Sequence, residues 1–185
     1  MNSYLLRVWG LWDRIYYYSS RLQYVEKGEN LFRVVLMPYW DRTPLYTRSG
    51  TMISKGDLVV KLHIHNYKLA KILFERKGAH ALGLILLREI RRSLPGLVRF
   101  IDHHPNREQI KGIVGTTFLY RGAENLGFTV YSPPLTLKMR IKNWYLRWMM
   151  RMVHPQGKDR LDRQAEPLMV RRVFMSKAEL YRYYA

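Results

Sequence analysis

Two histidines stand two residues apart in a stretch whose pattern is typical of a β-strand. In residues 58–65 apolar side chains alternate with His63 and His65, and because successive strand side chains point to opposite faces, both rings share one face. Such a pair can hold a metal ion, but a third ligand would have to come from His80, His103, His104 or a carboxylate, and the sequence does not show which of these lies close, so we predict no metal and no cofactor. An ordinary half-buried face is the simplest interpretation, and a polar ligand or catalytic site is the alternative.

A second candidate site lies where a predicted strand ends in threonines. Thr116 and Thr117 offer hydroxyls, the helix start behind them offers free backbone N–H groups, and Arg121 adds a cation, a combination that suits an anion. A structural interpretation is equally coherent: Thr117 caps a short helix, Arg121 pairs with Glu124, and Gly127 ends the helix. The segment therefore predicts either an anion site or a short capped helix.

Catalysis stays an open alternative. The sequence contains none of the G-x-S-x-G, H-E-x-x-H, G-x-G-x-x-G or phosphate-loop motifs, and because it has no cysteine it has no thiol nucleophile. For an enzyme, the candidate catalytic residues are His63, Arg121 and Glu124, converging in one pocket. The candidate ligand-binding residues are Asn66, Thr116, Thr117 and Arg121, although Asn66 is most simply a helix N-cap.

Two predicted helices combine tryptophans with basic residues. Apolar positions about three apart predict an amphipathic helix within residues 1–24, and a second one spans 136–153 in a stretch without acidic residues. Tryptophan suits the boundary between headgroups and acyl chains, and Lys and Arg suit anionic headgroups. The candidate residues for a membrane or other anionic surface are Trp9, Trp12, Lys138, Arg140, Lys142, Trp144, Arg147, Trp148 and Arg151.

The same two helices have a simpler interpretation. An apolar stripe on a chain of this size usually packs on the core, which leaves a solvated basic face. Nucleic acid is a third interpretation, because the formal net charge is +18. However, no zinc-finger spacing or aromatic RNA-binding strand is present, so an anionic lipid or glycan is the preferred partner.

The candidate residues lie on predicted strands and helices. The pattern of these elements predicts one α+β domain over residues 1–185, with residues 1–24 peripheral. A chain that is 48% hydrophobic and lacks cysteine is neither disordered nor a disulfide scaffold. Strands and helices do not alternate regularly, which favours a small mixed or antiparallel sheet packed by several helices. The predicted strands are 31–37, 45–53, 58–65, 110–116, 128–131 and 170–175. The predicted helices besides those two are 66–78, 79–93 with a break at Pro95 and Gly96, and one that opens with a capping box of Ser176 and Glu179.

No segment has the character of a membrane-spanning helix. The longest uninterrupted apolar run extends only from Ala81 to Leu87, and charged residues divide the N-terminal apolar stretch. We therefore expect a cytoplasmic protein that is peripheral at the inner face of the membrane.

Short motifs in a fixed order connect the chain to a known family. The motifs include Leu62–Asn66, Arg91–Pro95, Gly115–Thr117 and Arg121–Phe128, and together they resemble the YkoP-like family of Gram-positive bacteria. That family is uncharacterised and brings no established catalytic residues. Its similar domains occur fused to polysaccharide deacetylases, which implies an accessory role in cell-envelope glycan or lipid-linked sugar metabolism. A carboxylate is common in the family at the position of His65, which weakens the two-histidine metal site and favours His63 and Asn66.

These observations predict a non-catalytic accessory protein of cell-envelope metabolism that binds an anionic lipid, glycan or membrane surface. An enzyme acting on a phosphorylated or lipid-linked sugar is the first alternative, and a nucleic-acid-binding protein is the second.

Overall fold

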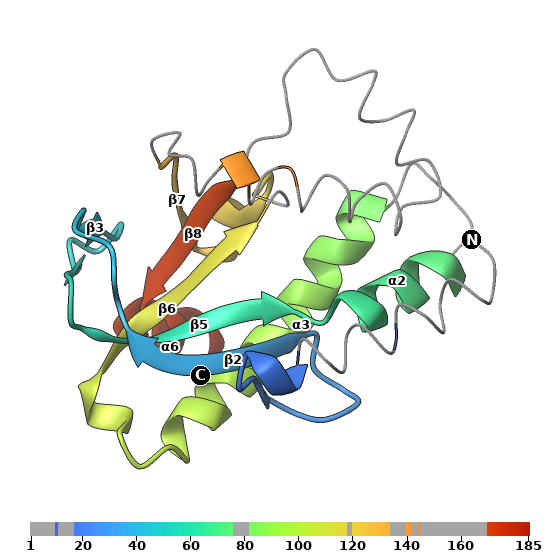
Figure 1. Cartoon of the computed structure of the whole chain (residues 1–185), viewed down its shortest axis with the longest axis horizontal. Coiled ribbons are helices and arrows are strands. Elements are labelled where there is room, and N and C mark those ends of the chain that lie inside the picture. The colour runs from blue at the N-terminus through green and yellow to red at the C-terminus, as the bar shows by residue number, and fades with distance from the viewer. Residues whose placement is uncertain are drawn as a thin grey trace.

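A mixed six-stranded sheet forms the centre of the molecule (Figure 1). The computed structural model describes residues 10, 17–75, 82–117, 120–133, 140, 141, 144 and 170–185. The strand order is β1-β2-β5-β6-β8-β7, and a separate hairpin pairs β3 with β4. The strands are β1 (Gln23–Tyr24), β2 (Phe32–Pro38), β3 (Leu45–Tyr46), β4 (Met52–Ile53), β5 (Leu58–Ile64), β6 (Ile110–Thr117), β7 (Thr129–Tyr131) and β8 (Arg171–Ser176). The predicted α+β class is confirmed.

Strand directions explain the mixed character of the sheet. β5 and β6 run parallel, which requires the long connection through α2 (Asn66–Glu75) and α3 (Leu82–Asp102). The other neighbouring pairs are antiparallel. β8 follows all other strands along the chain and yet lies between β6 and β7.

One face of the sheet packs against α3 and α6 (Lys177–Tyr184), and we call it the helix face. In Figure 1 both helices lie behind the sheet. Val34, Val60 and Ile113 on the strands pack with Leu97 of α3 and Leu180 of α6, and none of the five is measurably exposed. Because this face holds the larger core cluster, it contributes most of the apolar burial that stabilises the described fold.

The β3–β4 hairpin covers one end of the opposite face, which we call the hairpin face. Leu45 and Ile53 are cross-strand partners and are buried, together with Val59, Val114 and Phe174 of the sheet. Tyr46 and Met52, the other cross-strand pair, point outward and are exposed. The hairpin is therefore a small amphipathic cover.

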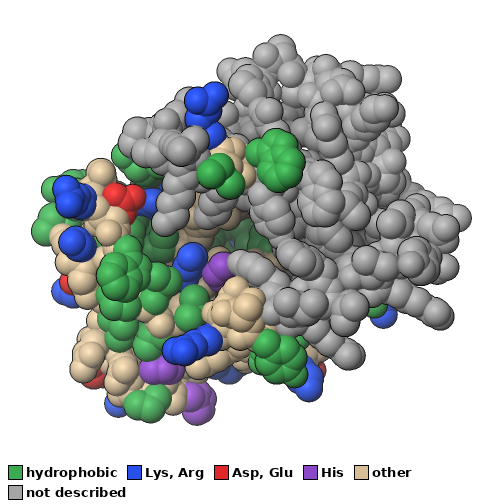
Figure 2. All heavy atoms as spheres, in the orientation of Figure 1, with side chains coloured by type: hydrophobic (Ala, Val, Ile, Leu, Met, Phe, Trp, Pro, Cys, Tyr) green, Lys and Arg blue, Asp and Glu red, His purple; other side chains and the backbone are tan. Residues whose placement is uncertain are grey.

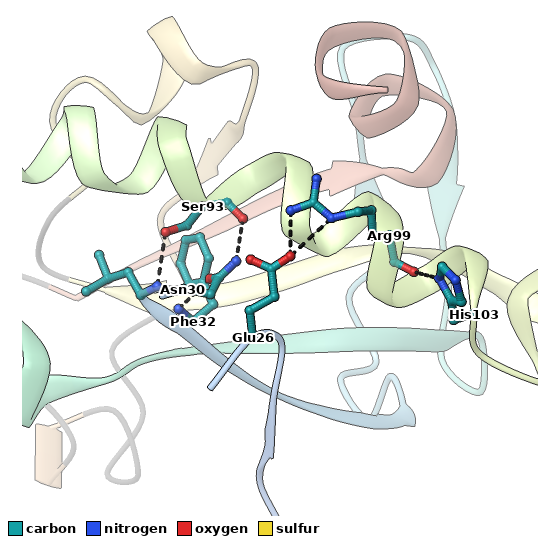
Figure 3. Close-up of polar contacts among 7 residues, drawn as sticks. Glu26, Asn30, Phe32, Ser93, Arg99 and His103 are labelled. Atoms are coloured by element: carbon teal, nitrogen blue, oxygen red, sulfur yellow. Dashed lines mark hydrogen bonds and ion pairs between the residues drawn. The ribbon is translucent and has the colours of Figure 1, made fainter. Parts of the chain in front are cut away.

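The predicted break at Pro95 and Gly96 is wrong, because α3 continues through both residues to Asp102. Gly96 instead permits a close approach: a Cβ there would lie 2.4 Å from Nδ2 of Asn30. Asn30 donates to the Ser93 carbonyl, and the Ser93 hydroxyl accepts from the backbone N–H of Leu31 (Figure 3). Pro95 and Gly96 therefore lie beside the hydrogen bonds that join the segment before β2 to α3.

The predicted capping box at the start of α6 is confirmed. The Ser176 hydroxyl accepts from the backbone N–H of Glu179, and the Glu179 carboxylate accepts from the backbone N–H of Ser176 at 2.8 Å. The other carboxylate oxygen of Glu179 accepts from the backbone N–H of Ser49 in the hairpin loop at 2.7 Å. One buried carboxylate therefore joins the start of α6 to the β3–β4 turn.

The predicted start of the short helix at Thr117 is wrong. Thr117 is the last residue of β6, and the helical turn is a short 3-10 segment, η3 (Ala123–Leu126). Gly122 and Gly127 flank η3 with positive φ angles, which glycine adopts without strain. β6 therefore ends at Thr117, one residue later than the predicted end at residue 116.

Candidate functional site

Cationic and polar side chains gather on the part of the hairpin face that β3 and β4 do not cover. The registers place Arg33 of β2 opposite His63 of β5, and Thr116 of β6 opposite Arg172 of β8. Since β5 pairs with β6 through Leu62 and Gly115, the next residues along the two strands, His63 and Thr116, are neighbours too. Figure 2 views this face and shows it hollowed, with Lys or Arg and His side chains bordering the hollow.

The Arg33 guanidinium is held in an aromatic setting, and the residue is only 3% exposed. It lies 5.1 Å from the ring centre of Tyr17 and 4.8 Å from that of Tyr24, and it donates to the Tyr24 hydroxyl. Such cation–π contacts stabilise a cation that burial would otherwise disfavour. Arg33 is therefore a fixed positive charge at one side of the face.

His65 shares the hairpin face with His63, as the alternation predicts, but its ring is engaged by Arg33. The Arg33 guanidinium lies 2.6 Å from Nε2 of His65, and because a guanidinium can only donate, Nε2 accepts. Because Nε2 already accepts this hydrogen bond, it is not available as a metal ligand. Within the described residues, no three potential ligands gather closely enough to hold a metal ion.

Arg172 carries a second positive charge on this face, and Asp41 pairs with it. Its Nη2 lies 2.8 Å from the Asp41 carboxylate, and its Nη1 donates to the Tyr39 hydroxyl at 2.7 Å. Burial acts to raise the pKa of Asp41, but the hydrogen bond from Arg172, the backbone hydrogen bond from Thr43 and the charge of Arg172 together outweigh burial and hold that pKa below its usual value. Asp41 is therefore an ionised carboxylate at neutral pH.

The structure separates the three candidate catalytic residues. Arg121 and Glu124 are exposed beside β7, and the Glu124 carbonyl accepts from Arg48 of the hairpin loop. The buried residues of η3 pack into the core of the helix face, whereas His63 lies on the hairpin face. β7 lies three strands from β5, or about 14 Å at the usual strand spacing. His63 therefore has Arg33 and Thr116 as neighbours rather than Arg121 and Glu124.

The candidate ligand-binding residues divide in the same way. Thr116 lies on the hairpin face, whereas Thr117 pairs with Arg171 and lies on the helix face. Arg121 is exposed. Asn66 is the first residue of α2, and its side chain lies outside the described part of the chain.

Three residues of the predicted late helix are described, and all three are helical and exposed. Trp144 is 70% exposed and Ile141 is 60% exposed, and Arg140 precedes them. The other candidate surface residues lie outside the described residues: Trp9, Trp12, Lys138, Lys142, Arg147, Trp148 and Arg151.

Arg33 and Arg172 are not among the candidate residues predicted from the sequence. Arg33 is the one arginine of a short apolar run that was predicted as a strand, whereas Arg172 follows Arg171 in another, and alternation places neighbouring residues of a strand on opposite faces. Which strands are neighbours depends on sheet order, and β8 meets β6 only through long-range pairing. The position of these two arginines on one face of one sheet could not be predicted without the order of the strands in that sheet.

Comparison with known proteins adds the family. The model of the YkoP domain matches residues 2–184, so the chain belongs to the YkoP family, as the motifs predict. A similar relative is the "Uncharacterized protein YkoP" of Bacillus subtilis (strain 168), which is 37% identical over 134 residues, or 72% of this chain and 73% of that protein. No solved structure matches the chain. Among the described helices, none is both long and apolar enough to cross a bilayer.

Proposed function

We propose that this protein is a non-catalytic accessory protein that binds an anionic lipid surface through a helix carrying Arg140, Ile141 and Trp144. The observation that carries the proposal is the exposure of Ile141 and Trp144, which are three residues apart. Residues with this spacing lie on one side of a helix, so the two large apolar side chains are presented together. An exposed tryptophan beside a basic residue is typical of interfacial helices.

The free energies expected from charge attraction and from burial of apolar side chains are large enough for binding to an anionic surface. Each basic residue near an anionic surface contributes about 1 kcal/mol, and burial of a large apolar side chain contributes about 2 kcal/mol. The net charge of +18 provides attraction toward an anionic bilayer. The role in envelope metabolism is supported by the family resemblance alone, since the YkoP relative is itself uncharacterised.

Vesicle co-sedimentation tests this function. We expect binding to vesicles of phosphatidylglycerol in phosphatidylcholine, and little binding to phosphatidylcholine alone. Trp144→Ala should weaken binding to the anionic vesicles about tenfold, because the apolar contact is lost. Trp40→Ala is the matched control, since Trp40 is 67% exposed but lies in the β2–β3 loop, and it should bind as the wild type does.

Two outcomes would contradict the proposal. One is an equal lack of binding to both kinds of vesicle at low salt, and the other is a similar loss for the Trp144 and Trp40 variants. Salt-dependent binding to duplex or single-stranded nucleic acid without vesicle binding would favour the nucleic-acid alternative instead.

A further inference from the structure

We infer that one side of α3 binds the phosphate backbone of double-stranded nucleic acid through a row of arginines, without reading the bases. The row, called the arginine stripe below, consists of Arg88, Arg91, Arg92 and Arg99. This inference is independent of the lipid contact proposed for Trp144, because it concerns another element and another partner.

The arginine stripe lies on the side of α3 that faces away from the sheet. At about 100° per residue, Arg91, Arg92 and Arg99 fall within about 60° of Arg88 around the helix axis. All four are exposed, whereas Leu97, on the opposite side of α3, is buried in the core cluster of the helix face. The four cations therefore form one surface and not a scattered set.

Three of the four arginines are open to a ligand. Within the residues that the structure describes, Arg88, Arg91 and Arg92 take part in no hydrogen bond and no ion pair, and all three are exposed. Arg99 differs, because its Nε and Nη2 both donate to Oε1 of Glu26 (Figure 3). Each of the three open guanidiniums still has its N–H groups for an incoming anion.

The acidic residues of α3 do not neutralise the arginine stripe. The helix contains two of them, Glu89 and Asp102. The Asp102 carboxylate accepts from the Tyr181 hydroxyl at 2.5 Å, and Glu89 is half-buried and interacts electrostatically with Lys68. The stripe therefore presents a positive field to the solvent, which attracts anions.

The chemistry and length of the arginine stripe suit a chain of phosphates. All four basic residues of α3 are arginines, and the planar guanidinium can donate two parallel hydrogen bonds to one phosphate. At a rise of 1.5 Å per residue, the stripe is about 16 Å long from Arg88 to Arg99, which equals about five phosphates along one strand of a duplex. A straight helix can therefore follow the straight backbone of a duplex.

A lipid surface fits the arginine stripe less well. Interfacial helices combine cations with apolar side chains that enter the bilayer. On α3 only Leu84, one turn before Arg88, is both large and apolar and also exposed. Contact with phosphates alone needs no base-reading motif, and the sequence contains neither zinc-finger spacing nor an aromatic RNA-binding strand. The duplex backbone is therefore the preferred partner for this surface.

The salt dependence of binding tests the inference. The probe is a fluorescent DNA duplex of 20 base pairs, titrated with the full chain by anisotropy between 50 and 300 mM NaCl. We expect a dissociation constant of about 1–100 µM at 150 mM NaCl, the range of sequence-independent binding. A second duplex of unrelated sequence should bind equally well, because no base is read.

The test variant combines Arg88→Gln with Arg92→Gln. Neither arginine has a partner in the described fold, and glutamine has a similar helix propensity, so the urea midpoint should equal that of the wild type. Each lost phosphate contact lowers the slope of log K against log salt by about 0.9, so the two together lower it by about 1.8. If the two lines meet at 1 M salt, affinity falls about thirtyfold at 150 mM NaCl.

The matched control combines Arg42→Gln with Lys55→Gln. Both residues are exposed, and they lie in the loops before β3 and after β4, so the control removes the same two charges from a surface away from α3. The control variant should keep the wild-type slope and lose less than about threefold in affinity, because salt screens distant charges. Trp144→Ala should bind the duplex as the wild type does, so failure of the lipid contact and failure of the arginine stripe are separately visible.

Three outcomes would overturn the inference. They are the absence of duplex binding by the wild type, an equal loss of affinity in the two double variants, and a difference of more than about tenfold between the two duplex sequences. The third would mean that bases are read. If the α3 variant instead loses binding to phosphatidylglycerol vesicles more than the control does, while their duplex affinities agree, the stripe contacts lipid and the inference is wrong.

Discussion

Glu179 makes more contacts with the fold than its place on a short terminal helix suggests. Its two oxygens accept from two backbone N–H groups, of Ser49 and Ser176, that lie far apart in the sequence, and the Ser176 hydroxyl donates as well. Burial acts to raise the pKa of Glu179, but these hydrogen bonds outweigh burial and lower the pKa below its usual value. The ionised carboxylate is therefore part of the folded structure.

We predict that Glu179→Gln destabilises the protein by about 2–3 kcal/mol at pH 7, because charge-assisted hydrogen bonds are lost and buried donors are left unsatisfied. A lowered folded-state pKa gives stability that is present above the unfolded pKa and is lost as pH falls through the folded pKa. Urea unfolding at a series of pH values should show the two proteins converging in acid.

Glu108→Gln is the control for that experiment. Its side chain is 81% exposed and pairs only at the surface, so the substitution should change the free energy of unfolding by less than about 0.5 kcal/mol. A gap between wild type and Glu179→Gln that stays constant down to the acid transition would contradict the prediction.

At the scale of elements, α3 offers two glycines with opposite surroundings. A Cβ at Gly96 would meet Nδ2 of Asn30 at 2.4 Å and the Glu26 carboxylate at 3.1 Å, whereas a Cβ at Gly83 has no atom of the described residues within 4 Å. Glu26 also pairs with Arg99 one turn further along α3, as Figure 3 shows. The helix is therefore tight against the segment before β2 at one glycine and open at the other.

We predict that Gly83→Ala stabilises the protein by about 0.5–1 kcal/mol, because alanine has the higher helix propensity. Gly96→Ala should destabilise it by about 1–3 kcal/mol, because the added methyl group displaces the Asn30 side chain from Ser93. Thermal and urea unfolding would measure both, and the same sign for the two variants would count against this contact.

The elements also show where the sequence was informative. Alternation predicted β5 and the capping-box spacing predicted α6, because those signals are local. Pro95 and Gly96 misled the prediction, since the contact that occupies this place comes from Asn30, far away in the sequence. His63 and Thr116 were candidates from the sequence, but their position between Arg33 and Arg172 on the hairpin face could not be predicted, because only the sheet order makes these strands neighbours.

At the scale of the whole molecule, charge is the dominant property. The sequence has 32 Lys and Arg against 14 Asp and Glu, so most cations have no acidic residue available to them. Repulsion between like charges opposes a compact state, and salt screens it over about 10 Å at 0.1 M.

We therefore predict that raising NaCl from 10 to 150 mM increases the melting temperature by about 2–4 °C, equivalent to about 1 kcal/mol for a chain of this length. Differential scanning calorimetry would measure the change, with equal osmolality of sucrose as the control for solvent effects. A melting temperature that falls with NaCl would mean that surface ion pairs outweigh the repulsion.

The position of β8 affects how the chain can fold as it is made. β7 has its sheet partner only in β8 among the described strands, and β6 needs β8 along one whole edge. Until residues 171–176 leave the ribosome, the nascent chain therefore holds one open strand edge and one strand without a neighbour. Completion of the sheet has to wait for the last strand, and until then the exposed edge of β6 can pair wrongly with another chain.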